Sequence, residues 1–378
     1  MKSRHTDLTR LGWNEWFADR AACGTGYAIA RVSAVDRDLL TVVDQAGTFR
    51  AKVAGSYLYR NHLSQELPCV GDWVCVEKQP HDELGLVHML LERRTVLRRK
   101  SAGETVDYQM IAANIDYVVI VQSCHCDFNL KRLERYLVMI RDGGADPVVL
   151  LTKTDLVEPD ALAAQLAEIR TAGVTAPVLT LSNVTREGVD NFKQTLLPAK
   201  TYCFVGSSGV GKSTLINQLL GREMLQTNDV SETGEGRHTT VRRELIILEG
   251  GALVIDNPGM REFGILRAES GIGDNYSDII GLAPGCRFRN CSHTSEPGCA
   301  AREAVKAGDI SQERYDHYIK LRAESELCQL SYGERRKKER DVGRHIKSAK
   351  KDVEKKKDAS STPVDSPHYT PGTSQPLR

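Results

Sequence analysis

The chain has 378 residues, of which 40% are hydrophobic and 27% charged, with a formal net charge of +1 at pH 7. This composition fits a folded protein of two or three domains and excludes a chain that is disordered throughout. The charge is sorted along the sequence, because residues 335–358 carry twelve Lys/Arg against five Asp/Glu and leave a mildly acidic remainder. Such sorting points to a basic contact surface.

Targeting signals are not evident in the sequence. Residues 1–20 mix both charge signs and lack the continuous apolar stretch of a signal peptide. No run of 18 or more apolar residues predicts a membrane span. Ten cysteines, most of them scattered over so long a chain, do not resemble a secreted disulfide framework. We expect a cytoplasmic protein that does not bind membranes.

The first hundred residues predict an amphipathic N-terminal helix or extension over 1–20 and a β-rich domain over 21–98. Apolar positions suited to the helix are Leu8, Leu11, Trp13, Trp16 and Phe17. Five short strand-like segments separated by turns follow, at residues 26–35, 39–45, 48–54, 71–78 and 85–92. Short strands at this spacing favour a small OB-like β-barrel. The basic segment "RRTVLRRK" leads into the next domain.

From residue 99 to about 276, apolar strand-like segments alternate with amphipathic helical ones. Strands are expected at 115–123, 146–152, 176–182 and 201–206, and a hairpin over 242–259. Alternation of this kind predicts an α/β domain with a largely parallel sheet. Residues 277–330 are cysteine-containing and then helical, and residues 331–378 are a basic tail that we expect to be largely disordered.

A phosphate-binding loop is predicted directly after the strand that ends near residue 205. Gly206, Gly211, Lys212 and Ser213 satisfy G-x-x-x-x-G-K-[ST] in full. In such a loop the backbone N–H groups surround the phosphates, the lysine reaches the β- and γ-phosphates, and the serine ligates Mg²⁺. The predicted nucleotide-binding residues here are Gly206, Ser207, Ser208, Gly209, Val210, Gly211, Lys212, Ser213 and Thr214.

A second phosphate-side motif is Asp-Asn-Pro-Gly at the end of the apolar segment "ALVID". The carboxylate of Asp256 is placed to hold Mg²⁺ through water, and the N–H of Gly259 to sense a γ-phosphate. Taken alone, this tetrapeptide is an ordinary turn. Its position after a strand downstream of the phosphate loop favours the functional interpretation.

The stretch "VVLLTKTDL" predicts a guanine-recognition loop after another buried strand. Guanine presents two adjacent hydrogen-bond donors, and the carboxylate of Asp155 can accept a hydrogen bond from each. Adenine offers no such pair. The stem of Lys153 can lie along the base. Thr152 begins this loop, and Ser182 and Asn183 complete the expected base pocket. As an alternative, the tetrapeptide is only a helix cap.

The two motifs occur in the reverse of the usual order, since the base loop precedes the phosphate loop. Compact α/β domains have termini that often lie close together, so a rejoined chain is physically tolerable. The chain resembles the RsgA (YjeQ) family of circularly permuted GTPases that depend on the small ribosomal subunit, over roughly residues 21–325. The resemblance implies GTP/GDP and Mg²⁺ as ligands, and GTP hydrolysis in late maturation of the subunit. Thr152 and Asn183 depart from the usual pattern of the base loops.

Catalysis is the least defined part of the prediction. Many GTPases place Gln after the glycine of the Asp256 motif, where this chain has Met260, so slow intrinsic turnover is expected. The resemblance implies that Thr240 closes on Mg²⁺ and the γ-phosphate, with Thr239 as the alternative. We hypothesise that His238 positions the attacking water once a partner orders this segment. Otherwise it is a loop histidine.

A zinc site is predicted from Cys286, Cys291, His293 and Cys299, spaced C-x₄-C-x-H-x₅-C. Three thiolates and an imidazole form a closed tetrahedral set, which indicates one structural Zn²⁺. Cys124 and Cys126 are interpreted as ordinary residues.

The expected partner is the small ribosomal subunit and its rRNA, bound by a monomer. Aromatic residues of the barrel (Tyr57, Tyr59, Trp73), residues 287–289, the basic segment 93–100 and the tail are candidate RNA contacts. For Trp73, core packing is an equal alternative. Two other functions are weighed: an adenine-specific P-loop ATPase or kinase, and an RNA-binding scaffold with a mainly structural nucleotide site.

Overall fold

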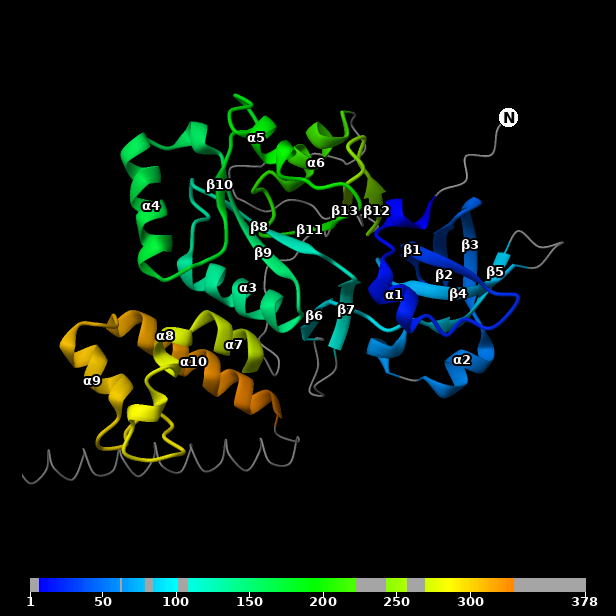
Figure 1. Cartoon of the computed structure of the whole chain (residues 1–378). Coiled ribbons are helices and arrows are strands. Elements are labelled where there is room, and N and C mark those ends of the chain that lie inside the picture. Colours follow the sequence, from blue (N-terminus) through cyan, green and yellow to red (C-terminus); the bar gives the residue numbers. More distant parts are fainter. Residues whose placement is uncertain are drawn as a thin grey trace, which may run out of the picture. The chain divides into compact units, whose positions relative to one another are not determined.

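The N-terminal strands close into a barrel whose interior is filled by small and branched side chains. In the computed structural model, β1 (Ala28–Asp36), β2 (Leu39–Asp44), β3 (Gly47–Val53), β4 (Trp73–Glu77) and β5 (Leu84–Leu90) close in the order β1-β2-β3-β5-β4 (Figure 1). Only the β3–β5 pairing is parallel. The interior residues are Ala30, Val32, Leu40, Val42, Ala51, Val74, Val76 and Val87. The expected OB-like barrel is confirmed, with the short helix α2 (Gly55–Arg60) after β3.

The structure describes residues 7–61, 63–78, 84–100, 108–221, 243–256 and 269–329. These residues belong to one compact unit, and residues 330–378 are assigned to another. The prediction of a disordered basic tail therefore lies outside the described residues. No helix among the described residues is long and apolar enough to cross a membrane.

The N-terminal extension forms two short helices rather than one. A 3₁₀ helix, η1 (Leu8–Leu11), ends where Gly12 adopts a φ of 88°, and α1 (Glu15–Arg20) begins after Asn14 caps it. The Trp13 and Phe17 rings lie 4.8 and 5.9 Å from that of Trp73. Trp73 is fully buried under them, so the suggestion that it stacks on RNA is wrong and the alternative of core packing holds.

Cys23 and Cys75 form a disulfide that joins the residues after α1 to β4. Their Cα atoms lie 5.8 Å apart, although 52 positions separate them in the chain. Sequence spacing did not reveal this pairing. Cys124 is buried and unbonded, and Cys126 is exposed, in agreement with their interpretation as ordinary residues.

The basic segment after the barrel, residues 93–100, is held in the fold by strand pairing and by ion pairs. Its second half forms β6 (Val96–Lys100), which pairs with β7 (Tyr108–Ala113), a strand that the sequence analysis did not predict. Three of its arginines pair with acidic residues: Arg93 with Asp72, Arg94 with Asp116 and Arg98 with Asp142. The interpretation of this segment as a phosphate-contacting bridge is therefore corrected for these three side chains, which already hold carboxylates.

The central domain contains a six-stranded sheet in the order β10-β9-β8-β11-β13-β12. Its strands are β8 (Tyr117–Ser123), β9 (Asp146–Thr152), β10 (Val178–Thr180), β11 (Thr201–Val205), β12 (Leu245–Ile247) and β13 (Leu253–Asp256). All neighbouring strands are parallel except β12 and β13. The predicted α/β domain with a largely parallel sheet is confirmed.

Helices cover both faces of this sheet, so alternate residues of the central strands enter two different cores. Val119 and Val121 of β8 pack with residues of α5 (Val189–Gln194) and α6 (Lys212–Leu220). Val118 and Ile120 pack with residues of α3 (Leu130–Asp142) and α4 (Pro159–Thr171). Figure 1 shows α3 and α6 on opposite sides of the sheet.

Four C-terminal helices follow: α7 (Glu269–Asn275), α8 (Ser277–Ile280), α9 (Ala300–Ala307) and α10 (Gln312–Gln329). Of these, α7 and α10 contact α3. At Gly271 a Cβ would lie 1.9 Å from the carbonyl oxygen of Val138, so only glycine permits the close approach of α7 to α3. On the same side, buried Glu134 of α3 pairs with His317 of α10.

Candidate nucleotide site and metal centre

The predicted nucleotide motifs meet at one edge of the sheet. Four parallel strands end directly before or within them: β11 before the phosphate loop, β9 at Thr152, β10 before Ser182 and β13 at Asp256. The carboxyl ends of parallel strands share an edge, and this edge is where open α/β sheets bind ligands. β11 lies between β8 and β13, so the phosphate loop is central in this arrangement.

The phosphate loop connects β11 to α6 through three glycines with positive φ. Gly206, Gly209 and Gly211 have φ values of 147°, 77° and 96°, conformations that residues with a side chain rarely adopt. At Gly206 a Cβ would also lie 2.2 Å from the carbonyl oxygen of Val121 on β8. Ser207, Ser213 and Thr214 are partly exposed and Ser208 is exposed, so these hydroxyls are accessible to a ligand.

The ammonium group of Lys212 lies against the phosphate loop. It donates to the carbonyl oxygens of Gly206 and Ser207, the first at 2.9 Å. Burial lowers the pKa of Lys212 to about 8, although the nearby Asp256 carboxylate opposes this shift. Burial likewise raises the pKa of Asp256, and Lys212 opposes that rise. The loop thus holds a desolvated cation whose charge a bound polyphosphate would stabilise.

The base loops bring Asp155 and Ser182 together. The Ser182 hydroxyl donates to Oδ1 of Asp155 at 2.5 Å and accepts the backbone N–H groups of Val184 and Thr185. Ser182 is buried and Asp155 is exposed, so a fixed hydroxyl orients an accessible carboxylate. Lys153 has a φ of 58°, an uncommon conformation for a residue with a side chain. Such backbone outliers gather at ligand sites.

Thr152 occupies a supporting position. Its side chain is fully buried, and its hydroxyl donates to the carbonyl oxygen of Val210 at 2.6 Å. Sequence analysis assigned Thr152 to the base pocket, whereas the structure directs its hydroxyl to the phosphate loop. Asn183 was likewise assigned to the base pocket, whereas its side-chain amide donates to the carbonyl oxygen of Gly211 in the phosphate loop at 3.0 Å. A small residue is usual at this position, so the amide of Asn183 was the sequence signal for this additional contact.

The expected switch residues all lie outside the described residues; they are His238, Thr239, Thr240, Gly259 and Met260. Of the predicted Mg²⁺-site residues, Ser213 is the second residue of α6 and the buried Asp256 ends β13. A hydroxyl and a carboxylate are oxygen donors of the kind that Mg²⁺ prefers.

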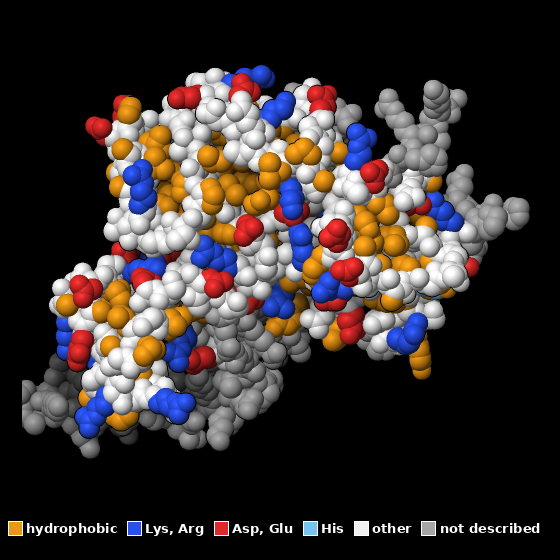
Figure 2. All heavy atoms as spheres, viewed as in Figure 1, with side chains coloured by type: hydrophobic (Ala, Val, Ile, Leu, Met, Phe, Trp, Pro, Cys, Tyr) orange, Lys and Arg blue, Asp and Glu red, His pale blue; other side chains and the backbone are white. Residues whose placement is uncertain are grey.

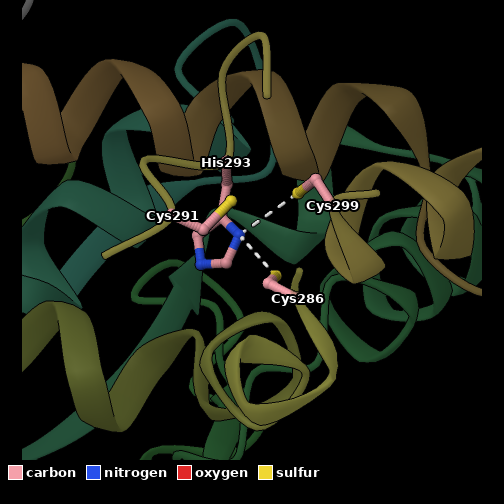
Figure 3. A group of neighbouring side chains, drawn as sticks. All are labelled: Cys286, Cys291, His293 and Cys299. Carbon is pink, nitrogen blue, oxygen red and sulfur yellow. Dashed lines mark hydrogen bonds between the residues drawn. The ribbon is translucent and has the colours of Figure 1, made fainter. Parts of the chain in front are cut away.

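The four predicted zinc ligands converge (Figure 3). One ligand atom from each of Cys286, Cys291, His293 and Cys299 lies within 4.8 Å of the others. Nδ1 of His293 is 3.6 Å from Sγ of Cys286 and 3.3 Å from Sγ of Cys299. Metal–ligand bonds of about 2.0–2.3 Å place tetrahedral ligands about 3.3–3.8 Å apart. The donor set and the two spacings from His293 therefore fit Zn²⁺.

The surroundings of this cluster hold its ligands in place. Glu296 accepts hydrogen bonds from the backbone and hydroxyl of Ser292, which hold the pKa of Glu296 at about 2. The Tyr315 hydroxyl of α10 donates to the carbonyl oxygen of His293. Burial lowers the pKa of His293 and favours the neutral imidazole that a metal requires. The Tyr315 contact anchors the ligand loop to α10.

The fold and the nucleotide motifs define a P-loop GTPase domain in which the base loops precede the phosphate loop. Solved structures share the arrangement: YjeQ from Thermotoga maritima superposes with a TM-score of 0.58 at 25% identity, covering 78% of this chain and 97% of that one. YloQ, a circularly permuted GTPase, superposes with a TM-score of 0.56 at 24% identity, covering 83% of this chain and 100% of that one.

The sequence comparisons identify the family. The model described as RsgA GTPase matches residues 90–266. The small ribosomal subunit biogenesis GTPase RsgA of Opitutus terrae is 40% identical over 329 residues, covering 84% of this chain and 89% of that protein. This chain belongs to the RsgA family of GTPases.

Proposed function

We propose that this chain hydrolyses GTP while bound to the small ribosomal subunit, late in its maturation, and that the subunit stimulates hydrolysis and is released by it. The observation that carries the proposal is the meeting of Lys212 and the Asp155–Ser182 pair at one sheet edge. A relative that covers most of the chain is named a small ribosomal subunit biogenesis GTPase. The adenine-specific alternative is disfavoured because Ser182 orients the carboxylate suited to guanine.

In the proposed reaction, each part of the site has one task. The Asp155 carboxylate accepts hydrogen bonds from the two donors of guanine, and the stem of Lys153 covers the base. The N–H groups of residues 206–214 and the ammonium of Lys212 bind the β- and γ-phosphates. Ser213 and Thr240, with Asp256 acting through water, would hold Mg²⁺, which would supply positive charge where negative charge accumulates. Gly259 senses the γ-phosphate and His238 orients the attacking water.

The proposed rRNA surface is narrower than the sequence suggested. Tyr59 of α2 has 81% of its surface exposed and stays a candidate for stacking, whereas Tyr57 is buried and its hydroxyl donates to the carbonyl oxygen of Glu66. In the zinc loop, Phe288 is 45% exposed and the Arg287 guanidinium lies 5.7 Å from its ring. Bases stack on aromatic side chains and guanidinium groups.

The basic tail remains part of this proposal. On the face shown in Figure 2, Lys and Arg side chains of the described residues are interspersed with Asp and Glu. The sequence gathers twelve Lys/Arg within residues 335–358. We therefore assign the salt-dependent phosphate contacts to this segment.

The remaining assignments are also proposals. The first is a division of the chain into residues 1–20, 21–98, 99–276, 277–330 and 331–378. The others are one structural Zn²⁺ bound within residues 277–330, a monomeric state, and a cytoplasmic location without membrane binding. Boundary 98/99 falls inside β6, and α7 before boundary 276/277 packs on α3. A cut at either place would leave buried surface exposed.

The deciding experiment is phosphate release from GTP and from ATP, each with and without purified small ribosomal subunits. The proposal predicts slow release from GTP alone, a large increase with subunits, and no such increase with ATP. Equal rates from GTP under both conditions would favour the scaffold function. Faster release from ATP would refute the assignment of Asp155 to guanine.

A further inference from the structure

Asn183 of the second base loop contacts the phosphate-loop helix at two points. Its side-chain Nδ2 donates to the carbonyl oxygen of Gly211, the residue that caps the start of α6, at 3.0 Å. Its own carbonyl oxygen accepts Nε2 of Gln218, near the other end of α6, at 2.8 Å. One residue of the base loop therefore holds both ends of the helix that follows the phosphate loop.

This contact is tight and depends on glycine. At Gly211 a Cβ would lie 2.5 Å from Nδ2 of Asn183, and the φ of 96° also disfavours a side chain. The preceding carbonyl, that of Val210, is held by the buried Thr152 hydroxyl. Side chains from two base loops thus bind two consecutive carbonyls of the phosphate loop.

Binding these two carbonyls orients the amides that follow them. In a trans peptide the C=O and the next N–H point in opposite directions. Holding the carbonyls of Val210 and Gly211 toward the base loops therefore turns the N–H groups of Gly211 and Lys212 away from those loops. In a phosphate loop, N–H groups at these positions are the ones that bind a phosphate.

We propose that Asn183 is a positioning residue that couples guanine recognition to the phosphate loop and slows the release of bound nucleotide. The inference rests on the proposed nucleotide site. Asn183 directly follows Ser182, whose hydroxyl orients Asp155. Guanine bound by Asp155 fixes the position of this loop, and the loop fixes the carbonyl of Gly211. By the same coupling, phosphate bound at the phosphate loop strengthens guanine binding.

The side chain of Asn183 contributes little to the stability of the fold. Its Oδ1 is buried and has no hydrogen-bond partner among the described residues. Replacing Asn183 by Ala removes one hydrogen bond and also one unsatisfied buried acceptor, two effects that oppose each other. Coupling can therefore be tested without unfolding the protein.

The test measures release of fluorescent mant-GDP from the full-length, zinc-loaded protein after excess unlabelled GDP is added. For Asn183→Ala we expect release about fivefold faster, as the loss of one hydrogen bond implies. Asn183→Asp should be at least as fast, because a carboxylate oxygen would face the Gly211 carbonyl. Thr185→Ala is the matched control, since its exposed side chain accepts a bond only within the same loop. It should stay within about twofold of wild type.

A second readout separates coupling from general damage. The thermal midpoint and the zinc content of the nucleotide-free protein should match wild type in Asn183→Ala, while the release rate rises. Unchanged release, or a fall in the midpoint together with faster release, would overturn the inference. Failure of the wild-type protein to bind mant-GDP would instead overturn the proposed nucleotide site itself.

Discussion

The hydroxyl of Thr152 donates a hydrogen bond of 2.6 Å to the carbonyl oxygen of Val210 and so ties the first base loop to the phosphate loop. The same hydroxyl lies 3.3 Å from the carbonyl oxygen of Gln122 on β8. Because Thr152 is fully buried, its contribution to nucleotide binding is indirect. It fixes a carbonyl of the loop that binds phosphate.

Replacing Thr152 by Val keeps the shape of the side chain and removes its hydroxyl. The Val210 carbonyl then loses its donor, and we expect the dissociation constant for GDP to rise by about five- to tenfold. Titration calorimetry measures this constant. Thr152→Ser is the matched control, because it retains the hydroxyl and should bind nearly as wild type does. A valine variant with wild-type affinity would show that the bond has no role in binding.

Asp155 is predicted to determine the choice of base. Asp155→Asn replaces an acceptor oxygen by an amide donor, so we expect the preference for GTP over ATP to fall by about 100-fold. Competition between the two nucleotides for binding measures the ratio. Asp160→Asn, at an exposed position in the first turn of α4, should leave it unchanged. Retained preference in Asp155→Asn would place guanine recognition elsewhere.

GDP binding should weaken as the pH rises above 8. Burial lowers the pKa of Lys212 to about 8 in the free protein, and a bound phosphate favours the ammonium form, so the pKa is higher in the complex. Affinity is then constant below pH 8 and falls by up to about tenfold per pH unit above it.

The control for this pH profile is Lys212→Arg, which remains charged throughout. Titration of the guanine base contributes equally to both proteins, so the difference between the two profiles isolates Lys212. We expect affinities measured between pH 6.5 and 9.5 to diverge above pH 8. Parallel profiles would contradict the assignment of a lowered pKa to Lys212.

Local motifs were predictable because their chemistry is contiguous in the chain. The phosphate loop, the base loop and the zinc ligands each lie within about fifteen residues, and short strands and amphipathic helices flank them. The strand pattern of the barrel was equally readable, because alternating burial leaves a period of two. The break in the N-terminal helix was missed, although Gly12 marks it.

Contacts that join distant positions were not predictable. The Arg31–Thr201 hydrogen bond spans 170 positions, and the Cys23–Cys75 disulfide spans 52. From the sequence alone, the side chain of Thr152 could face the base or the phosphate loop. The packing of β9 against its neighbours determines which of the two it contacts. Sequence therefore names the residues of the proposed site, whereas the contacts that orient the described ones required the fold.

The zinc centre should be required for the structure of residues 286–299. Chelation of the metal leaves three thiols and an imidazole without a common partner, in a segment with few apolar residues. We expect loss of one zinc per chain, measured by a colorimetric indicator, and rapid proteolysis within this segment. Cys291→Ser should bind zinc weakly. Cys126→Ser removes an exposed cysteine outside the cluster and should retain one zinc, and equal zinc content in the two variants would contradict the ligand assignment.

Arg31 should be among the residues on which stability depends most. Its buried guanidinium donates to the carbonyl oxygens of Leu11, Gly71 and Asn114 and to the hydroxyl of Thr201, and so links the N-terminal extension, the barrel and the sheet of the GTPase domain. Burial lowers its pKa only to about 10, so it stays charged at neutral pH.

Arg31→Ala removes the donor that all four of these acceptors share. We expect the free energy of unfolding to fall by about 3 kcal/mol, measured by urea denaturation followed by circular dichroism. Arg50→Ala, which removes an exposed arginine of the same barrel, should change it by less than about 0.5 kcal/mol. Equal effects of the two substitutions would mean that water replaces the Arg31 contacts without cost. A fall specific to Arg31→Ala would show that the barrel and the GTPase domain are stabilised through one buried cation.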